Sequence, residues 1–237
     1  MYVDLSDLYA QLAGTDQREK LFARSPQSVL DRDTVRMRRA LLLTEQKQYE
    51  QALALLKDHR FKPWEGGQVV RQVFVACNLE EGRANLAAGR YREAEDAFRR
   101  AAQYPENLGV GKPNEPHDEE ALYWLGEALK GEGKDSEARG AWEEAAKVGK
   151  RTPTASQPFE AAALSKLGRS EEGEKLAASL VDNASKESAG ATALFVAGLA
   201  EALRGRSGPA QQFFQRALEI DPALWQARIE IDRATAR

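Results

Sequence analysis

The sequence predicts an all-α protein built from repeated helix pairs. Ala, Glu, Leu and Arg dominate the chain while β-branched residues are scarce, which favours helices over strands. Five segments share one pattern of small and apolar residues, which indicates an internal repeat. Prolines and glycines gather in connectors between these segments. We therefore expect a right-handed α-solenoid of about five helix pairs, in which neighbouring pairs bury each other's apolar faces.

Residues 1–31 precede the first repeat and are predicted to form two short helices, over residues 4–13 and 16–24. The first repeat of a solenoid exposes an apolar face that needs covering. We assign 1–31 to an N-terminal cap on this ground.

The repeat array is predicted to span residues 32–222. Each unit has a small residue at a common position and an apolar residue four positions later. The small residues are Ala52, Ala94, Ala138, Gly173 and Ala210. The residues four positions later are Leu56, Phe98, Trp142, Ala177 and Phe214. Because this spacing places both residues on one helix face, each segment is expected to be the second helix of a pair.

Two further positions upstream agree between the units. Five residues before the small residue stand Lys47, Gly89, Gly133, Gly168 and Gly205. Glycine there suits a tight turn between helices, where positive φ is often needed. Twelve residues before the small residue stand Ala40, Gly82, Gly126, Ala161 and Gly198. A small residue at this place is expected to let the first helix of a pair approach the second closely.

The first two intervals between units are longer than the others. The small residues are 42, 44, 35 and 37 residues apart (52 to 94, 94 to 138, 138 to 173, 173 to 210). The excess lies in FKPWEGG at 61–67 and in YPENLGVGKPNEPHD at 104–118. Long connectors in compact domains are usually packed or functional. We expect Phe61, Trp64, Tyr104 and Leu108 to pin these two connectors onto the helices.

The tail, residues 223–237, is predicted to be a final amphipathic helix that caps the array. Its apolar residues Leu224, Ile229 and Ile231 are expected to face inward, with the charged residues facing outward.

The array resembles the tetratricopeptide-repeat (TPR) family, most closely at 121–147 and at 193–222, which ends in Asp221-Pro222. The fourth unit departs from the family pattern at Gly173 and Ala177, and the first unit lacks the turn glycine. The two long connectors also resemble the C-terminal helical part of large bacterial TPR proteins that carry an N-terminal β-rich domain of unknown function. That resemblance implies that the chain is a portion of a longer protein.

The TPR resemblance implies a concave groove lined by the first helices of the pairs. Its exposed positions would fall fifteen and eleven residues before each small residue. They are Met37, Leu41, Leu79, Arg83, Tyr123, Glu127, Pro158, Ala162, Phe195 and Leu199. A largely apolar set of this kind suits a helical or extended peptide. It lacks the lysines and asparagines of the chaperone-binding members. The alternative is that several of these side chains only pack against neighbours or against the terminal helix.

Little in the sequence points to catalysis, a metal or a cofactor, and none of the three is predicted. Each Gly-Lys pair lacks the glycine and the Ser or Thr of a phosphate-binding loop. Two histidines and one cysteine are too few for a metal centre, and Cys77, in an apolar stretch, is expected to be a buried structural thiol. A net charge of −3 argues against nucleic acid binding. With neither a membrane-length apolar run nor a signal peptide, we expect a cytoplasmic protein.

Three function hypotheses remain open from the sequence. The first is a non-catalytic scaffold that binds a protein, a peptide or another domain of its parent chain. The second is an accessory helical domain of a larger enzyme whose active site lies outside this chain. The third is self-association into a homodimer through the end repeats, carried by the tail from Leu224 to Ile231.

Overall fold

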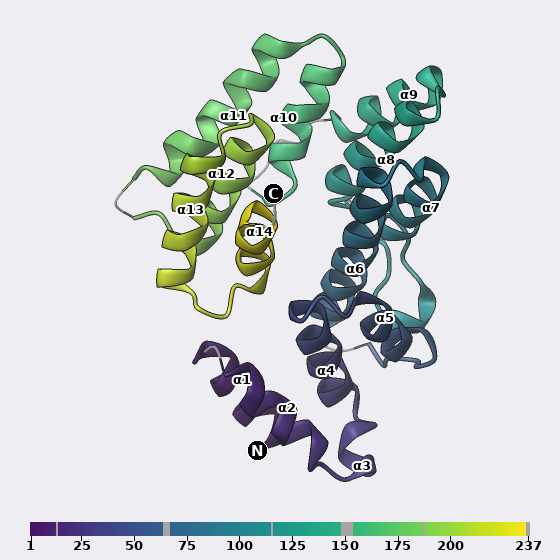
Figure 1. The fold of residues 1–237 in the computed structure, drawn as a ribbon, viewed down its shortest axis with the longest axis vertical. Coiled ribbons are helices and arrows are strands. Elements are labelled where there is room, and N and C mark those ends of the chain that lie inside the picture. Colours follow the sequence, from purple (N-terminus) through teal and green to yellow (C-terminus); the bar gives the residue numbers. More distant parts are fainter. Residues whose placement is uncertain (13, 64–66, 115, 148–153, 187, 236–237) are drawn as a thin grey trace.

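The computed structural model describes residues 1–12, 14–63, 67–114, 116–147, 154–186 and 188–235, and all regular structure in these ranges is helical (Figure 1). The helices are α1 Tyr2–Gln11, α2 Thr15–Ala23, α3 Gln27–Leu30, α4 Asp33–Glu45, α5 Tyr49–Lys57, α6 Gly67–Ala87, α7 Tyr91–Ala101, the 3₁₀ turn η1 Glu106–Leu108, α8 Glu119–Gly131, α9 Asp135–Ala145, α10 Gln157–Lys166, α11 Ser170–Ala184, α12 Ala191–Leu203, α13 Ser207–Ile220 and α14 Trp225–Thr235. The all-α prediction is confirmed.

Five antiparallel helix pairs form the array: α4–α5, α6–α7, α8–α9, α10–α11 and α12–α13. Each pair also packs against the next one along the chain, as a solenoid requires. In Figure 1, helices α4 to α9 form one stack and α10 to α13 form another, with α14 between them. The inner face of the molecule is the one that α14 contacts.

The turns inside the pairs have the predicted backbone conformation. The residue with positive φ is Gly89, Gly133, Gly168 or Gly205 in the last four pairs, with φ between 72° and 80°. In the first pair it is Lys47, with φ of 62°. Among the described residues, Lys47 is the only one other than glycine in this conformation. The turn is therefore shared by all five pairs, although the first pair builds it without glycine.

Close helix approach explains the small residues on the first helices. A Cβ atom added at Gly82, Gly126 or Gly198 would collide with a ring on the partner helix of the same pair. The rings are those of Phe98, Trp142 and Phe214, respectively. The two pairs that have a smaller side chain there, Leu56 or Ala177, have alanine in place of glycine on the first helix. In three pairs a large ring on one helix is therefore matched by a missing side chain on the other.

The fourth pair follows the same logic at Gly173. A Cβ atom there would collide with the main-chain carbonyl oxygen of Ala161 and with the Ser165 hydroxyl. Since Ala177 fills less space than an aromatic residue, α10 and α11 approach more closely, and the alanine found in other units would not fit. The departure of this unit from the family pattern is thus a consequence of its tighter packing.

The two long connectors pack against each other as well as against the helices. Phe61 and Leu108 are both buried in the cluster formed around Leu56 and Val70. The main-chain N–H of Phe61 donates to the carbonyl of Asn107 at 2.7 Å, and the Asn107 side-chain amide donates to the Leu56 carbonyl at 2.8 Å. The expectation for Phe61 and Leu108 is confirmed. Tyr104 is half-buried beneath Arg71, and Trp64 lies outside the described residues.

The N-terminal segment forms the two predicted helices, α1 and α2, and a short third helix, α3. All three pack against α4. Arg18 of α2, only 2% exposed, donates to both carboxylate oxygens of Glu45 at 2.9 and 2.5 Å. The segment is therefore fastened to the array by a buried ion pair as well as by apolar contacts.

The C-terminal helix α14 does more than cover α13. It packs against α13 and also reaches α4 at the other end of the array. Trp225, Ala227 and Ile229 are buried, while Leu224 and Ile231 are half-buried against the main core. The side chains expected to carry self-association are thus packed inside this chain. A homodimer through the ends stays a prediction.

Candidate functional site

The predicted groove positions lie on the inner face, but most of them are not exposed. Met37, Leu79, Tyr123, Phe195 and Leu199 are each at most 7% exposed. The expectation of open positions is therefore wrong for these five residues. Met37 packs into the cluster around Leu56 and Val70, and the other four belong to the main core, to which Ala227 of α14 also belongs.

One pocket of about 360 Å³ remains on this face, and we call it the inner pocket. It is bounded mainly by α6, α12 and α14. Four of the predicted groove residues line it: Leu79 and Arg83 from α6, and Phe195 and Leu199 from α12. The fold thus brings together residues that are more than a hundred positions apart in the sequence.

Helix α14 supplies the third wall of the inner pocket. Trp225, Ile229 and Arg233 all line it. These residues are four positions apart, so they lie along one face of the helix. The pocket consequently has an apolar floor and a charged edge.

The charged edge is a network of two arginines and three glutamates. Arg83 donates to Glu80 at 2.9 Å and also to Glu120, and its guanidinium lies 4.8 Å from the Trp124 ring centre. Arg233 donates to Glu80 and to Glu230. Burial alone would lower the pKa of Arg233, but Glu230 and Glu80 raise it above its usual value. Arg233 therefore stays charged beside the pocket.

The other end of the inner pocket holds a buried polar group from the second connector. Arg71 donates to Asp118 at 3.3 Å, and the Tyr104 hydroxyl donates to the same oxygen at 3.1 Å. The Arg71 guanidinium lies 4.2 Å from the Tyr104 ring centre. Burial lowers the pKa of Arg71 and raises that of Asp118. This cluster ties the connector to α6 and makes that end of the pocket polar.

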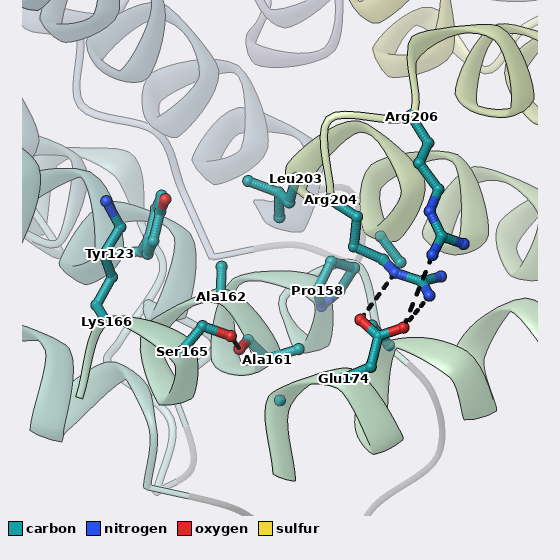
Figure 2. A pocket seen from close by; sticks show the side chains of 13 residues that line it. Tyr123, Pro158, Ala161, Ala162, Ser165, Lys166, Glu174, Leu203, Arg204 and Arg206 are labelled. Carbon is teal, nitrogen blue, oxygen red and sulfur yellow. Dashed lines mark hydrogen bonds and ion pairs between the residues drawn. The ribbon is translucent and has the colours of Figure 1, made fainter. Parts of the chain in front are cut away.

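A second pocket of about 290 Å³, the distal pocket, lies among α8, α10, α11 and α12 (Figure 2). Tyr123, Pro158 and Ala162, three predicted groove positions, line it. Figure 2 shows Glu174 across from Arg204 and Arg206, and the carboxylate pairs with both arginines. Glu127 pairs with Lys166 at 2.8 Å, and it is Lys166 that lines the pocket. The distal pocket is thus smaller than the inner pocket and is edged by ion pairs.

The first pair contributes to neither pocket. Met37 is buried and Leu41 is half-buried, and both belong to the cluster that contains Cys77. Cys77 is fully buried with its sulfur 3.2 Å from the Thr44 hydroxyl, and burial raises the pKa of the thiol to about 12. The cysteine is therefore buried as predicted.

Sequence reasoning missed Arg71, Trp225 and Arg233 as lining residues. The register of the repeats describes contacts between neighbouring pairs only. Where a terminal helix crosses to the far end of the array depends on the curvature summed over all pairs, and no residue spacing reports that curvature.

Comparison with known proteins finds a repeat family and a solved structure that are similar to this chain. The family model described as "Tetratricopeptide repeat" matches residues 79–156, which contain α7, α8 and α9. Among solved structures, one described as YrrB, "a TPR protein with an unusual peptide-binding site", is 17% identical. The match covers 87% of this chain and 95% of that chain, with a TM-score of 0.32. The comparison with curated proteins finds no match.

Within the described residues, each helix is too short or too polar to span a membrane.

The matched segment holds a complete helix pair, α8–α9, and the positive-φ turns and small–large contacts recur in the pairs on both sides of it. Residues 79–156 of the chain thus match the tetratricopeptide-repeat family.

Proposed function

We propose that this chain is a non-catalytic protein-interaction scaffold that binds a segment of a partner protein at the inner pocket. The observation that carries the proposal is the composition of that pocket. Leu79, Phe195 and Leu199 form an apolar floor, while Arg83 and Glu120 stand at its edge. A pocket of this type accepts one apolar anchor side chain and orients the rest of a peptide through charged groups.

The family supports the same function at a coarser level, since helical repeats of this kind present an extended surface to other proteins. The charged groups at the edge of the inner pocket, Arg83 and Glu120, form an ion pair with each other. The segment bound would belong to another protein or to another domain of a longer parent chain.

The test uses a variant that blocks the mouth of the inner pocket and leaves the core intact. Gln72 is an exposed residue of α6 that lines the pocket, so Gln72→Trp would place a large ring at its entrance. Gln51→Trp is the matched control, because Gln51 is equally exposed on α5 and lines neither pocket. Substituting Tyr123 or Phe195 by alanine would instead open the core and confuse unfolding with loss of binding.

A random peptide library displayed on phage would be selected on the wild-type chain. We expect enriched peptides with an apolar anchor residue that bind wild type and Gln51→Trp, with at least tenfold weaker binding to Gln72→Trp. Enriched peptides that bind Gln72→Trp as well as wild type would show that the inner pocket is not the site. If no peptide is enriched in repeated selections, the scaffold function itself is contradicted.

A further inference from the structure

Helix α14 stands where a partner helix would stand, and its contacts with the far end of the array are mainly ionic. Arg228 donates to Glu45 of α4 at 3.2 Å and to the carbonyl of Ala10 at 3.3 Å. Arg233 pairs with Glu80 of α6. Both arginines are about one-quarter exposed, at 25% and 26%. Their partners Glu45 and Glu80 are 9% and 14% exposed, so these pairs lie between the exposed and the fully buried class.

The helix is also too short to be stable by itself. It has 11 residues, and isolated helices of fewer than about 12–15 residues are marginal in water. Its helical state therefore depends on packing against the rest of the chain, where Trp225 and Ile229 are buried and α13 is the main neighbour. A chain end held in this way is able to exchange with another helix that makes the same contacts.

The face of α14 that meets the pocket defines what such a helix must carry. Trp225, Ile229 and Arg233 follow one another at intervals of four residues along it. The aromatic and aliphatic residues line the pocket together with Leu79, Phe195 and Leu199, and the arginine pairs with Glu80. The pattern is an aromatic residue, an aliphatic residue one turn later, and an arginine one turn beyond that. Glu45 offers a second carboxylate to a basic residue nearby.

We propose that α14 is an exchangeable occupant of the inner face, and that the partner is an amphipathic helix of another protein with this aromatic–aliphatic–arginine pattern. The inference rests on the proposed function, because it names the partner class for the same pocket. Binding of the partner helix requires α14 to leave, so the apparent Kd of the full chain for its partner equals the intrinsic Kd divided by the fraction of molecules in which α14 is undocked.

The experiment uses the full chain and a defined probe. The probe is a fluorescently labelled peptide of residues 221–235, and its binding is followed by fluorescence anisotropy. The variant Arg228→Ala/Arg233→Ala loosens α14 in the chain while leaving its apolar residues in place. Arg139→Ala/Arg216→Ala is the matched control, since it removes two exposed arginines from α9 and α13 without touching α14. Hydrogen exchange of α14 and of α12–α13 is measured for each chain.

We expect faster exchange in α14 alone for the loosened variant, and at least tenfold tighter binding of the peptide than to wild type or to the control. Peptides carrying Ile229→Glu or Arg233→Glu should bind at least tenfold more weakly than the unaltered peptide. Unchanged peptide affinity, or α14 amides as protected as in wild type, would overturn the inference. A dimer of the loosened variant in light scattering would overturn it too, because the occupant would then be a second copy.

These outcomes are separable from those for the scaffold itself. Library peptides that bind the wild-type chain while α14 remains protected from exchange would leave the scaffold function standing and refute the exchange of α14. Failure of the library selection would contradict the scaffold function whatever the labelled peptide does.

Discussion

Lys47 occupies the turn position that glycine holds in the other four helix pairs, with φ of 62°. An L-residue in this region is strained by about 1–2 kcal/mol, because its Cβ lies too close to the following carbonyl oxygen. Its ammonium group gains a pairing with Asp232 at 3.1 Å, but both side chains are about half exposed. Such a pair contributes about 0–1 kcal/mol. The backbone strain is therefore the larger of the two effects.

We predict that Lys47→Gly stabilises the protein by about 0.5–1 kcal/mol, because glycine adopts positive φ without the Cβ conflict. Urea denaturation of wild type and variant measures the difference. Lys47→Ala is the control, since it removes the ion pair and keeps the strain. Finding Lys47→Gly no more stable than Lys47→Ala would mean that the turn is not strained at this position.

At the scale of the element, three of the helix pairs have a close contact between a glycine on one helix and an aromatic ring on the other. In the third pair this contact joins Gly126 of α8 to Trp142 of α9, and the Trp142 indole N–H also donates to the carbonyl of Tyr123 at 3.2 Å. The two residues are therefore expected to act as a unit, so that changing one alters the cost of changing the other.

We predict that Gly126→Ala destabilises the protein by about 1–3 kcal/mol, because the added methyl group overpacks the contact with the indole ring. Trp142→Leu replaces the indole ring by the side chain found in the Ala40–Leu56 pair and so makes room for that methyl group. The double variant Gly126→Ala/Trp142→Leu should therefore be destabilised by at least about 1 kcal/mol less than the sum of the two single variants. Denaturation midpoints of the four proteins complete the cycle.

Gly140→Ala is the control within the same pair. A Cβ atom at Gly140 would meet no atom within 4 Å, so alanine there should stabilise α9 by about 0.5–1 kcal/mol through helix propensity alone. Strict additivity of Gly126→Ala and Trp142→Leu would show that the two residues do not form the proposed contact.

At the scale of the whole molecule, α14 turns an open array into a closed one. In a simple solenoid each pair contacts only its neighbours, so parts of the array unfold separately. Here Glu45 accepts from Arg18 of α2 and from Arg228 of α14, which is 183 residues away in the chain. One carboxylate therefore joins the N-terminal helices, the first pair and the C-terminal helix.

We predict that Glu45→Gln destabilises the protein by about 3 kcal/mol or more, because Arg18 is only 2% exposed and would lose its counter-charge. Asp7→Asn is the matched control: it also breaks a pair with an arginine, Arg38, but Asp7 is half exposed at 52%. The control should cost at most about 1 kcal/mol. Guanidinium denaturation measures both. Equal effects would show that the Arg18–Glu45 pair does not hold the ends of the array.

Most of the array could be predicted from residue spacing, because the contacts inside a helix pair join residues that are close in the sequence. Gly126 and Trp142 are 16 positions apart (126 to 142), and the turn glycine lies between them. The turn conformation, the close approach of the helices and the five-pair count all follow from such local relations. The buried state of Cys77 followed from its apolar neighbours.

The sequence by itself therefore determined the helices, their pairing and the positions that face inward. Only the tertiary structure decided which inward positions stay accessible. Small rotations between successive pairs add up along the array, and their sum brings α14 against α4 and α6. Leu79 and Phe195 are buried there together with Ala227 of α14, and a pocket remains between α6, α12 and α14 that no repeat contains alone.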